Sequence, residues 1–116
     1  MATLSRIAPE LPVHDLQMAL DFYQHQLGFQ VSMQRAEYAI VERDGVAIHL
    51  FYEKATNQSP VGIHIFTADL EELCSELEQR GACLSQKIDR KPWGNRDFRI
   101  RDGFGNELKF TEPLSE

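Results

Sequence analysis

The sequence contains little cysteine, which excludes a disulfide framework. Two cysteines occur among 116 residues, Cys74 and Cys83, and neither belongs to a CxxC or Cys-His pattern that would indicate a redox or metal site. We therefore predict that both thiols are reduced and buried. Because 42% of the residues are hydrophobic, a chain of this length can bury a core without such staples, and we expect one domain over residues 1–116.

Long apolar runs are also missing. No stretch is apolar over the length needed to cross a bilayer, and the opening Met-Ala-Thr-Leu-Ser-Arg lacks the apolar run of a secretion signal. These absences predict a cytoplasmic protein without a membrane partner. The sequence also lacks a glycine-rich phosphate loop and a nucleophile paired with a base, so the patterns typical of phosphate binding and acyl transfer are not found.

Positive charge is scarce as well. Twelve Lys and Arg stand against 18 Asp and Glu, and this net charge of −6 argues against nucleic acid as the main partner and favours a cationic ligand. The charge is uneven, because residues 86–101 hold six basic and two acidic residues, which gives +4 there and −10 elsewhere. We interpret this basic stretch as a solvated strand and loop in preference to an anion site.

The sequence does contain a motif written twice. The tripeptide Arg-Asp-Gly occurs at residues 43–45 and 101–103, each time between two strand-like runs. Upstream of each copy, an Asp caps an amphipathic helix and a Gly ends it, 13 residues later in one half and 12 in the other. This duplication predicts two β-α-β-β-β modules, at about 6–53 and 61–112, which must pack together because neither can bury its own face.

The expected elements follow from hydrophobic spacing and from turn residues. Pro9 and Pro12 interrupt the first strand, so it belongs at a sheet edge or in an arm. The order of the elements predicts an α+β fold with eight strands. We expect strands at residues 6–13, 29–35, 38–42, 46–52, 61–67, 83–86, 97–101 and 107–111, helices at 16–27 and between Asp69 and Gly81, a linker at 53–60 and a loop at 88–95.

Two longer runs resemble a known family. Residues 11–29 begin Leu-Pro-Val-His-Asp-Leu and end Leu-Gly-Phe, and residues 92–110 read Pro-Trp-Gly-Asn-Arg-Asp-Phe and end Gly-Asn-Glu-Leu-Lys-Phe. Together they resemble the glyoxalase, bleomycin resistance protein and extradiol dioxygenase superfamily, also called vicinal oxygen chelate. The resemblance covers essentially the whole chain. It implies paired modules whose strongly curved, eight-stranded sheet encloses a cavity.

Members of this superfamily differ in whether the cavity holds a divalent metal. The enzymes bind it through His, Glu or Gln on four strands, and matching by motif places those positions at Ala8, His49, Gly62 or Ile63, and Lys109. Only His49 can ligate, because Ala, Gly and Ile carry no donor and the Lys ammonium repels a cation. This pattern favours a metal-free binding protein.

A rearranged metal site is the alternative. His64 and Glu107 lie near two of the ligand positions, so His49, His64 and Glu107 are a candidate set for Zn, Ni, Mn or Fe in a glyoxalase-like or dioxygenase-like enzyme. We favour a different role for each histidine. His49 is predicted to line the cavity as a polar group, and His64 to be partly buried and hydrogen-bonded to backbone.

Among metal-free members, the chain looks most like the bleomycin resistance proteins. Tyr38 and Trp93 match aromatic residues of their binding groove, and each also has a structural interpretation, as a strand aromatic and a loop anchor respectively. Two rings can sandwich the flat bithiazole of bleomycin, while an acidic groove attracts its cationic tail. Phe51 shares the strand face of His49 and supplies an apolar wall, and Glu107 completes the predicted ligand site.

The resemblance also implies a homodimer. Residues 8–9 match the point where the N-terminal strand of those proteins leaves one subunit for the other, so Pro9 is predicted to be the hinge of an exchanged arm. Our leading hypothesis is a metal-free protein that sequesters an aromatic, cationic antibiotic. The metal-dependent enzyme and a metabolite-sensing module are the alternatives.

Overall fold

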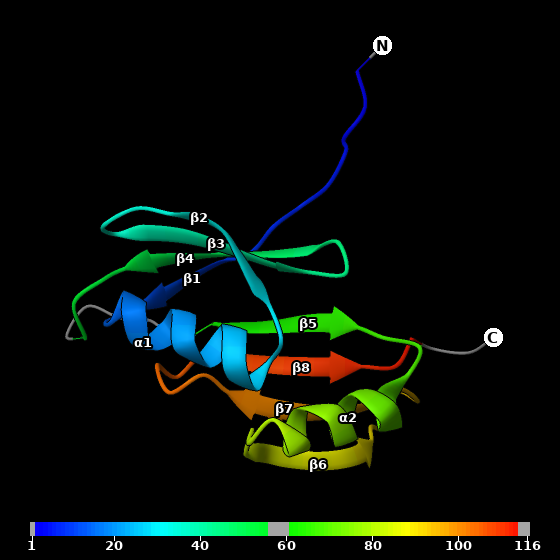
Figure 1. Ribbon diagram of the computed structural model, residues 1–116. Helices are drawn as coiled ribbons and strands as arrows, with labels where there is room; N and C mark the ends of the chain where they lie inside the picture. Colours follow the sequence, from blue (N-terminus) through cyan, green and yellow to red (C-terminus); the bar gives the residue numbers. More distant parts are fainter. Residues whose placement is uncertain (1, 56–60, 114–116) are drawn as a thin grey trace.

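The chain folds into two modules with the same order of elements (Figure 1). The computed structural model describes residues 2–55 and 61–113. The N-terminal module contains β1 (Glu10–Val13), α1 (Leu16–Asp21), the π-helix η1 (Phe22–Gln26), β2 (Gln30–Gln34), β3 (Tyr38–Arg43) and β4 (Val46–Tyr52). The C-terminal module contains β5 (Gly62–Phe66), α2 (Leu70–Gln79), β6 (Leu84–Arg90), β7 (Arg96–Arg101) and β8 (Glu107–Thr111).

Each module forms its own four-stranded sheet, with strand order β1-β4-β3-β2 in one and β5-β8-β7-β6 in the other. The first strand of each module runs parallel to the last, and the remaining pairs are antiparallel. The predicted α+β class and the eight strands are therefore confirmed. The prediction of one continuous eight-stranded sheet is wrong. The alternation of apolar and polar residues along a strand shows which face of the strand is buried, but it does not show which strands pair at their edges.

The hydrophobic alternation places the core beneath each sheet. In β4, Ile48 and Leu50 are fully buried on the helix side, and in β8, Leu108 and Phe110 are buried in the same way. Helix α1 begins at Asp15, whose carboxylate accepts from the backbone N–H of Met18 at 3.0 Å. No helix in the described ranges is both long and apolar enough to cross a bilayer.

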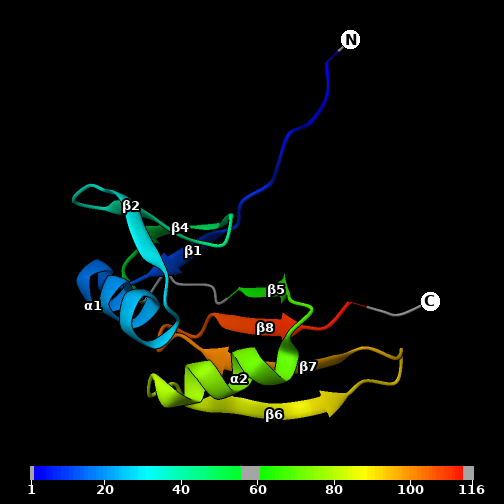
Figure 2. The same ribbon diagram turned by 45° about the vertical axis from the view of Figure 1, so that its right-hand side comes forward.

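Several predicted boundaries change in the structure. The first strand begins at Glu10, and residues 2–9 form an extended arm that runs away from both sheets in both views (Figure 1, Figure 2). The predicted helix 16–27 ends as an α-helix at Asp21 and continues as η1. Strand β6 reaches Arg90 and replaces the start of the loop predicted at 88–95. Residues 56–60 of the predicted linker lie outside the described residues.

A buried polar joint connects the two modules. The carboxylate of Asp102, 3% exposed, accepts from the Tyr23 hydroxyl at 3.1 Å and from the Asn106 amide at 2.8 Å. The same amide donates to the backbone carbonyl of Pro12 at 2.8 Å. Burial raises the pKa of Asp102, and burial together with the Asp102 charge raises the pKa of Tyr23. Because these groups satisfy one another, they fix the C-terminal module against η1 and β1.

The two cysteines have different environments. Cys74 is buried on α2, as predicted, and burial raises the pKa of its thiol. Cys83 is exposed, so its predicted burial is wrong. It lies between the buried Ala82 and the first residue of β6, where the chain turns its side chain toward solvent.

Candidate functional site

Each sheet has a second face that points away from its helix, and the predicted site residues are divided between these two faces. We call the residues on the outward side of β1, β3 and β4 the N-face, which comprises Glu10, Pro12, Tyr38, Ile40, Glu42, Ala47, His49 and Phe51. We call the outward side of β5, β7 and β8 the C-face, which comprises Gly62, His64, Phe66, Asp97, Arg99, Arg101, Glu107, Lys109 and Thr111.

A hydrogen-bonded trio occupies the centre of the N-face. The Tyr38 hydroxyl lies 2.7 Å from a carboxylate oxygen of Glu10 and 2.7 Å from Nδ1 of His49. The hydrogen bond to Glu10 is the main cause of a raised pKa at Tyr38. With the hydroxyl proton donated to Glu10, the phenol oxygen accepts from Nδ1–H of His49, which leaves Nε2 of that imidazole as an acceptor.

Aromatic surface adjoins this trio. Tyr38 is the cross-strand partner of Phe51, which in turn pairs with Pro12 of β1. Both rings are half-buried, and the rings of Tyr38 and His49 meet edge to face with centroids 5.6 Å apart. The N-face thus offers a ring surface with polar atoms at fixed positions, which is the composition expected of a small-molecule site.

The C-face is charged. Glu107 pairs with Arg99 and Arg101, each at 3.5 Å. Arg99 also contacts Asp97 at 3.3 Å, and that carboxylate is buried and accepts from the Gln86 amide at 2.6 Å. The predicted ligand residue Glu107 therefore lies on an outward face, where its carboxylate is already engaged by two guanidinium groups.

Trp93 lies at the tip of the turn between β6 and β7. Its side chain is 64% exposed, and the turn is closed by backbone hydrogen bonds from Lys91 to Asn95 and from Gly94 to Lys91. Arg90 adds a hydrogen bond to the Gly94 carbonyl at 2.7 Å. The indole is thus held by a well-bonded turn and presents its ring to solvent.

The alternative metal set is not assembled within one chain. His49 is on the N-face, whereas His64 and Glu107 are on the C-face. Among residues 2–55 and 61–113, no three His, Cys, Asp or Glu side chains lie close enough together to hold a metal ion. The prediction for His64 also changes, because its ring is exposed and its Nδ1 lies 2.8 Å from the hydroxyl of Thr111 rather than a backbone group.

The other positions matched to metal ligands have distinct orientations. Ile63 packs against the core and so points away from the C-face. Gly62 and Lys109 both belong to the C-face, and a Cβ added at Gly62 would lie 3.5 Å from the Lys109 ammonium. Ala8 belongs to the arm, just before Pro9, whose carbonyl accepts from the His49 backbone N–H at 3.0 Å.

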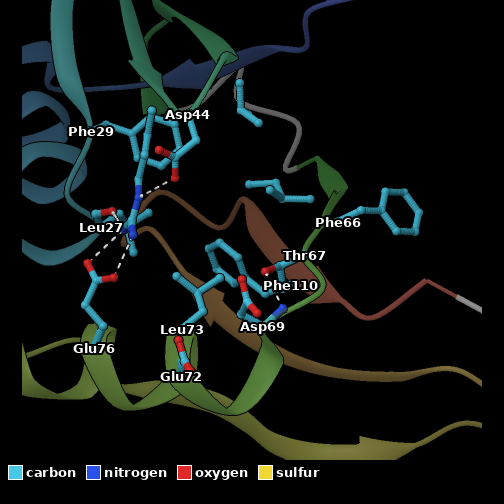
Figure 3. Close-up of a pocket in the computed structure, with 13 residues that line it drawn as sticks. Leu27, Phe29, Asp44, Phe66, Thr67, Asp69, Glu72, Leu73, Glu76 and Phe110 are labelled. Carbon is cyan, nitrogen blue, oxygen red and sulfur yellow. Dashed lines mark hydrogen bonds and ion pairs between the residues drawn. The ribbon is translucent and has the colours of Figure 1, made fainter.

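A cavity of about 500 Å³ lies where the modules meet and reaches the C-face at Phe66 (Figure 3). Its inner wall is apolar, with Leu27, Phe29, Leu73 and Phe110 among its residues. Its charged residues are mostly acidic and include Asp44, Asp69, Glu72 and Glu76. The Arg43 guanidinium spans part of it and pairs with Glu76 at 2.6 Å.

Sequence reasoning missed three contributors to these faces. Glu10 was not a candidate, because its contact with Tyr38 depends on the parallel register that sets Glu10 opposite His49. Asp97 and Arg99 belong to the basic stretch that we interpreted as solvated, yet Asp97 is 2% exposed. Their alternation in Arg-Asp-Phe-Arg-Ile-Arg was a usable signal, since it places Asp97 and Arg99 on one strand face.

Comparison with known proteins gives a consistent family. Residues 3–110 match the model of the Glyoxalase/Bleomycin resistance protein/Dioxygenase superfamily. A bleomycin resistance protein of Geobacillus stearothermophilus is 26% identical over 125 residues, covering 91% of this chain and 95% of the relative. A bleomycin resistance protein of Staphylococcus aureus matches to the same extent.

Solved structures agree on the fold. The crystal structure of a bleomycin resistance determinant encoded on the transposon Tn5 superimposes with a TM-score of 0.83 at 19% identity, covering 94% of this chain and 98% of that one. A bleomycin-binding protein complexed with bleomycin gives a TM-score of 0.82 at 19% identity, covering 95% and 99%. At these identities the likeness establishes the fold.

Proposed function

This chain belongs to the Glyoxalase/Bleomycin resistance protein/Dioxygenase superfamily, and from that premise we propose that it is a small-molecule binding protein of the bleomycin-resistance type. The observation that carries the proposal is the N-face. There, Tyr38 and Phe51 lie side by side across β3 and β4, and Tyr38 is fixed by Glu10 and His49. The resemblance to bleomycin resistance proteins over 91% of the chain supports the same reading.

The ligand on the N-face is aromatic and carries positive charge. Stacking on Tyr38 and Phe51 removes the aromatic part of the ligand from water. A cationic group near Glu10 meets its carboxylate, one oxygen of which accepts from the Tyr38 hydroxyl. The net charge of −6 draws such a ligand to the protein. Bleomycin combines a flat aromatic part with a cationic tail, so it is the first ligand to test.

The groove is completed by a second copy of the chain. The predicted ligand residues of one chain lie on two separate sheets, with Tyr38, His49 and Phe51 on the N-face and Trp93 and Glu107 in the C-terminal module. In a homodimer, the N-face of one copy and the C-face of its partner form one groove, and two equal grooves follow from the symmetry.

The N-terminal arm supports this assembly. Leu4 and Ile7 are 101% and 95% exposed, an unfavourable state for large apolar side chains in water. Pro9 restricts the backbone at the point where the arm leaves β1, and so acts as the hinge. In the proposed dimer, the arm of one copy lies in the cavity of the other copy (Figure 3). The apolar walls of that cavity accept Leu4 and Ile7, and its acidic residues face Arg6.

Titration with metal-free bleomycin tests the proposal. Trp93 is the single tryptophan, so its fluorescence reports on the groove directly. We expect a saturable change at one ligand per chain, and a Tyr38→Ala variant should bind at least about tenfold more weakly, because it loses its stacking platform. Tyr52→Ala is the matched control, since Tyr52 is exposed on the opposite side of β4 and should leave binding unchanged.

Calorimetry on the same samples guards against a silent fluorophore. An absence of both heat and fluorescence change at high micromolar bleomycin would remove the drug-specific proposal. Equal losses in Tyr38→Ala and Tyr52→Ala would remove the N-face as the binding surface, even if the wild-type protein binds.

A further inference from the structure

A row of polar residues crosses the whole C-terminal sheet. The register sets His64 of β5 opposite Lys109 of β8, Lys109 opposite Arg99 of β7, and Arg99 opposite Gln86 of β6. Neighbouring strands in a sheet are about 4.8 Å apart, so these side chains stand next to one another on the C-face. Two of them carry basic side chains, and one carries an imidazole.

The carboxylates beside this row are already neutralised by other groups. Asp97 is paired with Arg99 at 3.3 Å and with Lys91 at 3.8 Å, and Lys91 also contacts Asp89 at 3.5 Å. Glu107 is shared by Arg99 and Arg101. These ion pairs join three cations (Lys91, Arg99, Arg101) to three anions (Asp89, Asp97, Glu107), so their charges balance, and Lys109 beside them gives an excess of one positive charge.

Lys109 carries that excess. Its ammonium has no ion pair or hydrogen bond to any residue in the described part of the chain, although the side chain is half-buried. Nε of Arg99, its cross-strand neighbour, is buried and likewise has no hydrogen-bond partner among the described residues. Two cationic donors thus lie side by side on one face with bonding capacity unused, a costly arrangement in a partly dry site.

The β5 residues beside the ammonium are exposed, so an anion can reach it from solvent. Gly62, on the free edge strand β5, is exposed and has no side chain, and even an added Cβ would contact only Lys109 there, at 3.4 and 3.5 Å. On the other side, His64 uses Nδ1 for Thr111, which leaves its Nε2 for another partner. An anion at this position meets Lys109 directly and approaches both His64 and Arg99.

We infer that the C-face holds an oxyanion subsite, centred on Lys109, that binds a carboxylate or phosphate group. This rests on the proposed function in that the subsite lies in the same groove. Besides bleomycin, the groove thereby admits aromatic ligands that present a cation to the N-face and an oxyanion to the C-face. Anion binding itself needs only one chain, so it can be tested without the ligand.

The probes are inorganic phosphate and acetate, added separately at constant ionic strength with chloride as the reference anion. Binding is followed by the backbone amide NMR shifts of Gly62, His64 and Lys109. We expect saturable shifts at these residues with at least one oxyanion and none with chloride, and the comparison of phosphate with acetate identifies the preferred group. Matching shifts from chloride would overturn the inference, as would flat titrations with both oxyanions.

Charge-matched variants locate the site. Lys109→Met should weaken oxyanion binding at least about tenfold, since it removes the direct ion pair while keeping the stem, and Lys109→Arg should retain it. Lys87→Met, an exposed position on β6, has the same net charge as Lys109→Met and should bind like wild type. Unfolding curves confirm that each variant is folded. Equal binding by Lys109→Met and Lys87→Met would contradict the inference.

The two proposals fail separately in this design. Oxyanion binding without any response to bleomycin would contradict the bleomycin-type function and would still support the subsite. Bleomycin binding with no oxyanion response sinks the subsite alone.

Discussion

The two modules share one topology and differ in what their equivalent positions do. On the N-face, β4 carries His49 and Phe51 beside Tyr38, and the surface is aromatic with the carboxylates of Glu10 and Glu42. On the C-face, the equivalent strand β8 carries Glu107 and Lys109 within a network of charges. The two sheets keep the same strand order while the side chains on their outward faces differ. Under the proposals above, one face is suited to rings and cations and the other to oxyanions.

The two copies of Arg-Asp-Gly differ in the same way. In the first copy, Asp44 and Gly45 both have positive φ, 51° and 80°, and form the tight turn between β3 and β4, with the Asp44 side chain 84% exposed. In the second, Asp102 is buried and organises the loop before β8. One copy is a surface hairpin and the other is the joint that holds the modules together.

Substituting the two aspartates tests this contrast, with the largest expected effect at Asp102. The Asp102 carboxylate accepts hydrogen bonds from the Tyr23 hydroxyl and the Asn106 amide. In Asp102→Asn an NH₂ group replaces one of the two oxygens, so buried donors face each other. The free energy of unfolding should therefore fall by about 2 kcal/mol. Asp44→Asn should change it by no more than about 0.5 kcal/mol, because asparagine tolerates positive φ in an exposed turn. Urea unfolding at pH 7 measures both values.

Equal effects of the two substitutions would mean that the joint contributes no more than the hairpin.

The wild-type protein should also gain stability relative to Asp102→Asn as the pH falls toward about 4. The sign follows because burial raises the pKa of Asp102 in the folded state, so the folded protein takes up the proton first. An unchanged difference across that range would contradict the raised pKa.

Two tyrosines sharpen the comparison with a smaller effect. Tyr23→Phe removes the hydroxyl that donates to Asp102 and should lower the free energy of unfolding by about 1 kcal/mol at neutral pH. Tyr38→Phe removes an N-face hydroxyl and should affect stability less, because that group lies at the surface. Unfolding curves of both variants at pH 7 separate the two roles.

The same pair differs at alkaline pH. Burial raises the pKa of Tyr23 well above its usual value of about 10, so its contribution to stability is complete below that pH and is lost as the pH rises through the alkaline range. Tyr23→Phe should therefore lose less stability between pH 7 and pH 10.5 than wild type loses. A steeper alkaline loss in Tyr23→Phe would reverse this assignment.

Much of the fold could be predicted because local patterns determine it. Period-two alternation located β4 and β8 within a residue, and the capping Asp15 located the start of α1. The π-helix η1 could not be predicted, because the burial of Tyr23 and Leu27, four residues apart, also fits the spacing of an α-helix. The division into two sheets depends on which strands pair at their edges, and these pairs involve residues far apart in the sequence.

The site could be predicted only in part, for a related reason. The resemblance proposed Tyr38, His49 and Trp93 as site residues, but their partners follow from tertiary register. Glu10 reaches Tyr38 because β1 runs parallel to β4. Lys109 could be identified as unable to bind a metal. That it has no partner within residues 2–55 and 61–113 is visible only once Asp97 and Glu107 are seen to be engaged by other cations.

The central claim is that one groove combines the N-face of one copy with the C-terminal module of another, and mixing two defective variants tests it most directly. Tyr38→Ala damages the N-face and Trp93→Ala damages the partner's side, so each homodimer has two damaged grooves. In a mixed dimer, one groove carries both substitutions and the other carries neither. After subunit exchange at equal concentrations, calorimetry with metal-free bleomycin should find about a quarter of the wild-type sites restored. If the exchanged mixture binds no more than the two variants measured apart, the shared groove is contradicted.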